Sequence, residues 1–413
     1  MAALAALYFP LATAMYYFHE QSLYLGVSIL YKVVFALMIV MLSLLVFLVK
    51  TDLFRAGILL KHMALLMLPH FLVLLVSLPL WVFNTSPMEV IRRGAFAQIY
   101  CIAIIFAGAG ILYVFGKNGL WLNLSAMLAA NLITILGAVR QVGFGEYFQE
   151  FITLIRTFGK ENGPGIAAAE INELTFAVGL YLLFLVLNWK DLRRSKLFFP
   201  MLFLTLFCYF SGFKRIGAFT IALCIAAGLL LMAVTQGKDR RRGWLLFLSI
   251  AAIVVSFVYL IVVRAGLFGF LEEHFDLNTM GRTTLNALVE QYYSLTPDYL
   301  GQGAGFISRL FSDLLVGISS VRALHNDILA LYIDIGFWGF WLWMFAFMPL
   351  RVMLVSKWQG IRGGILCACY CLFIIVTAFT DNTIYYVYVI GVSSILTMGG
   401  YFRKQASIQG DAL

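Results

Sequence analysis

Long, continuous runs of hydrophobic residues dominate the chain, and short charged or glycine-containing segments separate them. The runs have the length of a bilayer-crossing helix, which needs roughly 17–25 apolar residues. They lack the apolar–polar alternation of barrel strands. The pattern predicts an all-α polytopic membrane protein with about twelve transmembrane helices. These are expected near residues 3–18, 26–49, 63–83, 95–116, 119–138, 171–188, 197–213, 216–235, 244–263, 326–350, 363–380 and 383–400. Pro10 interrupts the short first run, so eleven spans is an alternative.

The amino-acid composition also indicates a membrane protein. Hydrophobic residues make up 62% of the 413 positions and charged residues only 12%. So little charge cannot cover a soluble domain, and lipid must be the solvent for most of the chain. No soluble domain or linker is visible, so residues 1–413 are expected to form a single transmembrane domain. All six cysteines lie in apolar runs and are interpreted as small core residues, and no metal-binding pattern is found.

Short clusters of basic residues predict the orientation of the helices. Four clusters fall on one side of the predicted spans, at 190–196, 238–242, 351–362 and 403–404. The positive-inside rule makes that side cytoplasmic and places both termini inside the cell. Topology therefore explains most of the basic residues behind the net charge of +9, and no nucleic-acid-binding motif is present. Two long segments then face outside: 139–170 and 264–325.

Each external segment contains an amphipathic stretch. Apolar residues recur at helical spacing between Tyr147 and Phe158 and again between Phe306 and Ile318. Such helices are expected to lie in the membrane interface. They either cap the helix bundle or shape a lateral entrance for a lipid-borne substrate. The sequence 301–305, Gly-Gln-Gly-Ala-Gly, lacks the features of a phosphate loop and is expected to be a flexible external turn.

The external face also carries basic residues that topology does not explain. They include Lys214 and Arg215, in a tight turn between two apolar runs, and Arg264, Arg282 and Arg322. The planar fork of arginine suits the oxygens of a phosphate or pyrophosphate. A lipid diphosphate is the ligand that these residues predict. The alternative is that their side chains simply reach lipid headgroups.

Candidate acid–base groups lie on the same face. His325 precedes the span 326–350, and a histidine there suits proton transfer from a sugar hydroxyl. Glu173 is a second candidate base or sugar ligand. Asp381 and Asn382 form an external turn, for which helix capping is the competing interpretation.

Four segments resemble, in order and topology, the O-antigen polymerase and ligase superfamily of bacterial membrane glycosyltransferases. They are Glu173–Leu183, Ser211–Phe219, the combination of Gly281–Arg282 with Tyr299–Phe306 and His325–Gly336, and Thr380–Asn382. The most specific piece is the His-Asn start of a helix that runs to Gly336 after a long external loop. Residues before Glu173 contribute only hydropathy to the resemblance.

The resemblance implies a GT-C-like, cofactor-free enzyme that works without a metal on the outer face of the bacterial cytoplasmic membrane. Its donor and acceptor would be oligosaccharide repeat units linked to polyprenyl diphosphate, and a chain-length regulator is a possible partner. Arg215 and Arg282 would hold the diphosphate, supported by Lys214, Arg264 and Arg322. His325 would be the base at the acceptor hydroxyl. Asn326, Asp327, Glu173 and Asp381 complete the site that the resemblance implies.

The local pattern is closer to polymerases of capsule or exopolysaccharide repeat units than to ligases. Two alternatives remain at this point. One is a ligase that transfers the glycan to another acceptor. The other is a transporter or flippase of lipid-linked glycans, although the sequence lacks the two related halves common in transporters.

Overall fold

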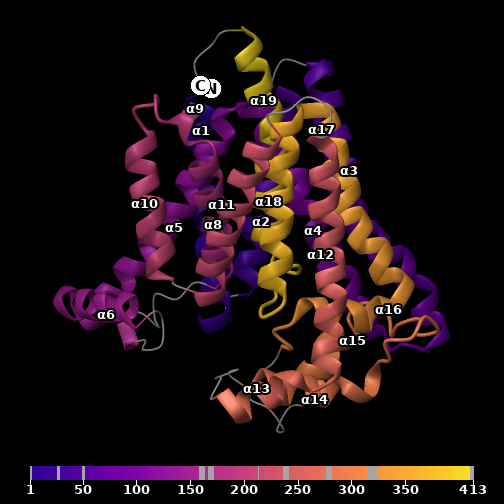
Figure 1. Cartoon of the computed structure of the whole chain (residues 1–413). Coiled ribbons are helices and arrows are strands. Elements are labelled where there is room, and N and C mark those ends of the chain that lie inside the picture. Colours follow the sequence, from indigo (N-terminus) through magenta and orange to yellow (C-terminus); the bar gives the residue numbers. More distant parts are fainter. Residues whose placement is uncertain are drawn as a thin grey trace.

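A computed structural model describes residues 2–25, 28–48, 52–157, 163–165, 172–212, 214–235, 241–275, 281–314 and 323–409. Within these ranges the chain forms helices and no strand. Most helices run side by side along one direction, and shorter ones lie across one end of the bundle (Figure 1). The expectation of an all-α fold is therefore confirmed.

A helix lies at each position where the hydropathy pattern predicted a span. These helices are α1 (Ala2–Leu25), α2 (Ser28–Leu48), α3 (Leu53–Phe83), α4 (Met88–Phe115), α5 (Asn118–Val142), α8 (Asn172–Leu187), α10 (Phe198–Ser211), α11 (Arg215–Val234), α12 (Arg241–Arg264), α16 (Asp327–Phe345), α18 (Ile361–Ala378) and α19 (Val387–Gln409). Among the described residues, 7 helices are long and apolar enough to cross a bilayer. Shorter apolar helices lie within α2, α8, α10 and α19.

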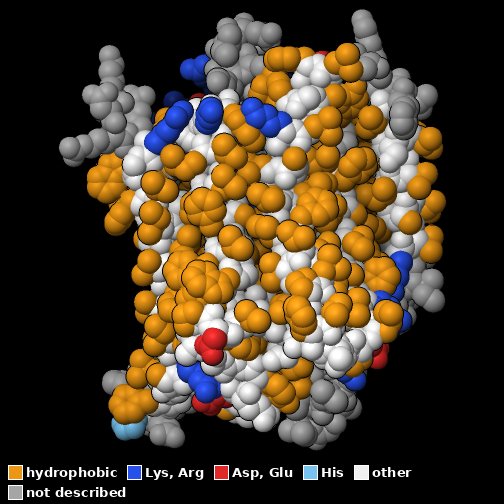
Figure 2. Space-filling view, turned by 90° about the vertical axis from the view of Figure 1, so that its right-hand side faces the viewer, with side chains coloured by type: hydrophobic (Ala, Val, Ile, Leu, Met, Phe, Trp, Pro, Cys, Tyr) orange, Lys and Arg blue, Asp and Glu red, His pale blue; other side chains and the backbone are white. Residues whose placement is uncertain are grey.

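The surface agrees with a membrane environment. Figure 2 shows hydrophobic side chains over the middle of one face, with Lys and Arg gathered toward its two ends. Many of the exposed apolar side chains are large, including Phe71, Phe203 and Phe247 at 51%, 74% and 65% exposure. Water would make such a surface costly, whereas lipid does not. The chain is a polytopic, helical membrane protein.

The core is centred on helices that are apolar on every side. In α8, Leu174, Phe176, Leu180 and Leu185 are all fully buried. A helix without a polar face has no side suited to water and is expected at the centre of a bundle. Helix α8 packs against α19, α10 and α11, and α18 packs against α11 and α17.

The prediction of a cytoplasmic loop at 351–362 was wrong for residues 351–359. Residues 351–359 continue the helical path of α16 through a π turn, η3 (Ala346–Leu350), into α17 (Arg351–Gln359). Arg351 is only 3% exposed. Its Nη2 donates to the Leu66 carbonyl at 3.2 Å, and its guanidinium lies 4.4 Å from the Phe347 ring centroid. Hydropathy placed a boundary at Arg351 because the charge interrupts the apolar run, but the protein interior provides partners for that charge.

Helix α16 is broken at Gly336, which has φ 71° and ψ −176°. The break frees backbone groups, and residues 299–303 pair with them. Gln302 N donates to the Ile333 carbonyl at 3.0 Å, Gly303 N to the Asp334 carbonyl at 2.7 Å, and Phe337 N to the Tyr299 carbonyl at 2.9 Å. Non-helical backbone in a membrane is tolerated where protein satisfies its polar groups in this way.

The segment 301–305 is therefore not the flexible external turn that its sequence suggested. A Cβ on Gly301 would lie 2.5 Å from Gly336 N, and one on Gly303 would lie 2.5 Å from the Trp81 ring. Trp81 Nε1 also donates to the Ala304 carbonyl at 3.0 Å. The glycines allow this backbone to pack directly against α3, α4 and α16.

Gly336→Ala is expected to lower the free energy of unfolding by about 3 kcal/mol or more, because this backbone conformation is nearly exclusive to glycine. The new Cβ would also lie 2.1 Å from the Leu300 carbonyl group. Thermal unfolding in detergent, followed by size-exclusion chromatography, measures the effect. Gly57→Ala is the matched control, since nothing lies within 4 Å of its Cβ position on α3. Equal stability of the two variants would contradict the prediction.

The first amphipathic stretch presents some of its apolar side chains outward, whereas the described apolar residues of the second are largely buried. The first forms α6 (Phe144–Arg156), where Phe144 and Phe148 are 74% and 53% exposed, as an interfacial helix requires. The second begins with α15 (Phe306–Arg309) and a π turn, η2 (Leu310–Leu314). Its Ile307, Leu310 and Phe311 are buried in the core, so this part caps the bundle. Residues 158–162, 166–171 and 315–322 lie outside the described ranges.

Candidate functional site

The predicted site residues gather at one end of the bundle. This end carries α6, α13 (Leu267–Phe275), α14 (Arg282–Val289) and α15, together with the turns that join α10 to α11 and α18 to α19 (Figure 1). The N-terminal end of α1 and the C-terminal end of α19 lie at the opposite end. Described residues distant in sequence are therefore brought to the same end of the bundle.

His325 and Asp381 form a pair. Their Nδ1 and Oδ1 atoms are 3.8 Å apart, with the His325 side chain 39% exposed and that of Asp381 11% exposed. Burial acts to raise the pKa of Asp381, but His325, the Tyr386 hydroxyl and the Asn382 backbone N–H together lower it. The Asp381 carboxylate consequently stays ionised at neutral pH, where it can orient the adjacent imidazole of His325.

The backbone at His325 is unusual. Its φ is +50°, in the left-handed region that few residues other than glycine adopt. This turn allows Asn326 to serve as the N-cap of α16, where its Oδ1 accepts from Leu329 N at 3.2 Å. Strained conformations of this kind are over-represented at functional sites. The His325 side chain keeps enough exposure to meet a substrate.

Two arginines are close to this pair. Arg282 begins α14 and Arg215 begins α11. Burial lowers the pKa of Arg282, Asp381 raises it, and the charge of Arg215 lowers it further. Arg282 thus lies within electrostatic range of both the Asp381 carboxylate and the Arg215 guanidinium. Lys214 is the half-buried N-cap residue of α11, next to Arg215.

Asn326 and Asp327 are almost fully buried, each at 1% exposure. Asn326 Nδ2 donates to Asn286 Oδ1 at 3.3 Å, which ties α16 to α14. Asp327 Oδ2 accepts from the backbone of Ile384 at 2.7 Å and of Tyr385 at 3.3 Å. Both residues thus hold the loops that carry Arg282 and Asp381 in place around His325.

Two of the predicted ligands have partners of their own. Arg264 pairs with Glu290, with 3.1 Å between Nη1 and Oε1, and so joins α12 to the 3₁₀ turn η1 (Glu290–Tyr292). Glu173 is 6% exposed and contacts His19 and the backbone N of Tyr388, each at 2.5 Å, which joins α8 to α1 and α19. Arg322 lies outside the described residues.

Two hollows border the cluster. One, of about 560 Å³, lies between the end of α12, α13 and α14, and Thr283, Asn286 and Glu290 line it. The other, of about 300 Å³, lies between α4, α15, α16 and the α18–α19 turn. In the described part of the chain, no group of three or more His, Cys, Asp or Glu side chains is placed to hold a metal.

Comparison of the sequence with models of known protein families gives no match, and comparison with curated proteins gives none either. The superfamily resemblance consequently remains a hypothesis that rests on the residues quoted for it. The arrangement around His325 is independent of that hypothesis, because it follows from the contacts themselves.

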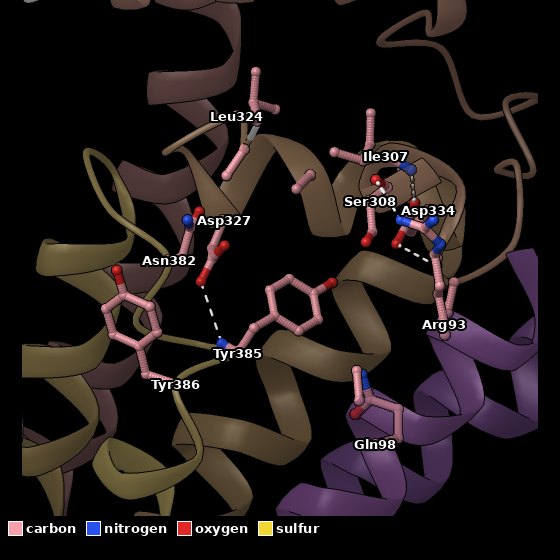
Figure 3. Close-up of a pocket in the computed structure, with 16 residues that line it drawn as sticks. Arg93, Gln98, Ile307, Ser308, Leu324, Asp327, Asp334, Asn382, Tyr385 and Tyr386 are labelled. Atoms are coloured by element: carbon pink, nitrogen blue, oxygen red, sulfur yellow. Dashed lines mark hydrogen bonds between the residues drawn. The ribbon is translucent and has the colours of Figure 1, made fainter. Parts of the chain in front are cut away.

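Sequence reasoning missed several polar residues of the smaller cavity, notably Gln98, Asp334 and Tyr385 (Figure 3). Asp334 gave a usable signal, since a carboxylate inside an apolar run is rare and demands a partner. Here its two oxygens accept from the backbone of Gly305 at 3.0 Å and Ile307 at 3.2 Å. Tyr385 gave no signal beyond its place in a tyrosine-rich stretch, which the structure shows to be the turn before α19.

Proposed function

We propose that the protein is a polymerase that joins polyprenyl-diphosphate-linked oligosaccharide repeat units into a surface polysaccharide. The observation that carries the proposal is the convergence of Arg215, Arg282, His325 and Asp381 at one membrane face. They come from four separate parts of the chain, and packing has to hold each in place. Asp381 supplies one negative charge near Arg282, and the two guanidinium groups together would suit the larger charge of a diphosphate.

The proposed reaction is attack by a sugar hydroxyl of one lipid-linked unit on C1 of the growing chain. The new bond joins the hydroxyl oxygen to C1, and the bond from C1 to the diphosphate oxygen breaks. His325 accepts the hydroxyl proton, and Asp381 stabilises the imidazolium that forms. Arg215 and Arg282 bind the negative charge that develops on the departing polyprenyl diphosphate. Attack from the face opposite the leaving group inverts the configuration at C1.

The wider setting belongs to the same proposal. The chain would cross a bacterial cytoplasmic membrane about twelve times in a GT-C-like arrangement. Both termini would face the cytoplasm and the cluster would face outside. The exposed Lys190, Arg193, Arg194 and Lys196, at the end opposite the cluster, support this orientation.

Purified protein in liposomes, given a lipid-linked repeat unit, is expected to produce a ladder of longer glycans and to release polyprenyl diphosphate. Gel electrophoresis of the glycan and chromatography of the lipid measure the two products. Activity is expected to persist in EDTA, because the arginines supply the positive charge that a metal would otherwise provide. A ladder that disappears with EDTA would contradict this assignment of the charge.

Three other outcomes would replace the proposal. Transfer only after a second glycan acceptor is added would indicate a ligase. Movement of a fluorescent lipid-linked sugar across the liposome membrane, without covalent change, would indicate a transporter. Neither transfer nor movement with repeat units of several structures would refute a glycan-lipid function.

A further inference from the structure

The smaller cavity shares a wall with the proposed catalytic cluster. Its volume of about 300 Å³ is at the lower end of the range for small-molecule sites. Asp327 and Asn382 line it, and they are close neighbours in sequence of His325 and Asp381. Tyr386 also lines it, and its hydroxyl donates to Asp381 Oδ1 at 2.7 Å. His325 and Asp381 do not themselves line the cavity, so a molecule in it would reach the histidine–carboxylate pair through the wall that Tyr386, Asp327 and Asn382 form.

The lining combines aromatic rings with neutral and charged polar groups. Figure 3 shows Tyr385 extending across the cavity between Asp327 and the Arg93–Ser308 side, with Gln98 below it. Sugars present apolar C–H faces, which pack on aromatic rings, and hydroxyls, which both donate and accept hydrogen bonds. The cavity offers partners for both features.

Two of the polar groups still have hydrogen-bonding capacity. The Tyr385 hydroxyl is buried and has no hydrogen-bond partner among the described residues. The Asp327 carboxylate uses Oδ2 for the backbone of Ile384 and Tyr385, and no described residue donates to its Oδ1. An unpaired hydroxyl facing a cavity is unfavourable unless a ligand or water pairs with it.

The residues that line the cavity suit a sugar better than a diphosphate. Asp327 and Asp334 both line it, whereas Lys214, Arg215 and Arg282 do not. Its one lining cation, Arg93, already contacts Glu89, the Ser308 carbonyl and the Ser312 hydroxyl. Lys214, Arg215 and Arg282 are therefore not placed to hold a diphosphate in this cavity, while the hydroxyls of a sugar would find acceptors there.

We infer that this cavity binds the terminal sugar of the acceptor glycan and presents its hydroxyl to His325. The inference rests on the proposed polymerase function and assigns the acceptor's position within it. Tyr385 donates to the sugar, Asp327 Oδ1 accepts from it, and the rings of Tyr385 and Tyr386 pack on its face. The volume admits a small part of the glycan, so the remaining repeat unit must extend outside the cavity.

The test separates acceptor from donor kinetics. The acceptor is the repeat-unit oligosaccharide on a short alkyl chain, which has no diphosphate and cannot act as donor. With lipid-linked donor held constant, Tyr385→Phe is expected to raise the KM for this acceptor about tenfold, as loss of one hydrogen bond predicts. The kcat and the KM for the donor are expected to stay within about twofold of wild type. Thermal stability is expected to be unchanged or higher, because the lost hydroxyl has no partner in the protein.

Tyr209→Phe is the matched control, since it removes another buried hydroxyl without a described partner, in α10. Its acceptor KM is expected to equal that of wild type. Ala97→Leu, which places a larger side chain in the cavity wall, is expected to raise the acceptor KM further while the protein still elutes as folded. An acceptor KM unchanged by Tyr385→Phe, in an enzyme that polymerises normally, would refute only this inference. A wild-type protein that forms no polymer would refute both proposals.

Discussion

Arg282→Ala is expected to lower the kcat of polymerisation by about 10²–10³-fold, the usual effect of removing one group that stabilises developing negative charge. Arg282 begins α14 and is partly buried beside Arg215 and Asp381. In that position its guanidinium would contact the leaving diphosphate, and water could not replace it at equal strength. Release of polyprenyl diphosphate under saturating substrate measures the loss.

Two further variants test whether the geometry of the arginine matters. Arg282→Lys keeps the charge but loses the planar pair of donors, so it is expected to recover only part of the rate. Arg215→Ala should cause a loss of similar size. The double alanine variant should lose less than the product of the two single effects, because both groups act on one diphosphate.

Arg92→Ala is the control for removal of a positive charge at the same end of the bundle. The Arg92 side chain is 61% exposed and pairs with Glu89 at 3.3 Å. Its replacement is expected to leave kcat near the wild-type value. Equal losses in Arg92→Ala and Arg282→Ala would show that bulk surface charge, and not a specific site, supports the activity.

His325→Asn is expected to lower kcat by about 10²–10⁴-fold, the typical contribution of a general base, with little change in the KM for the donor. Asparagine is chosen because it tolerates the left-handed φ of +50° that this position adopts. The fold and the N-cap at Asn326 should therefore be retained while the imidazole is removed. Single-turnover measurements with pre-bound donor would isolate the chemical step.

Thr85→Asn controls for the backbone conformation. Thr85 is the other non-glycine residue with positive φ among those described, at +45°. A β-branched residue is strained there, so asparagine should raise stability by about 1 kcal/mol and leave kcat unchanged. Full activity of His325→Asn, in a protein as stable as wild type, would exclude His325 as the base.

The positions of the helices were predictable because bilayer length imposes long apolar runs on the sequence. The residues at which the helices begin and end were harder to predict. Helix α3 begins ten residues before the predicted 63, at Leu53, because Asp52 caps it by accepting from Arg55 N at 2.9 Å. Local capping of this kind is decided by a few polar residues, to which a hydropathy window is insensitive.

The candidate site was only partly predictable. Arg215, Arg282, His325 and Asp381 were identified by residue type and resemblance, and the structure places them together. The structural pairing of Arg264 with Glu290 could not be foreseen, because it depends on how η1 folds back on α12. Sequence gives the chemistry of a side chain, whereas its partner across the bundle depends on tertiary packing.

The hydrogen bonds between residues 299–303 and the broken helix α16 limit how this end of the protein can move. Lifting this segment would expose several peptide groups to an apolar environment, at a cost of several kcal/mol for each. Residues 299–305 therefore act as a fixed wall, and they hold in place the half-helix that begins just after His325. Under the proposed function, a bulky lipid-linked glycan would accordingly arrive and depart along a route that does not require this wall to move.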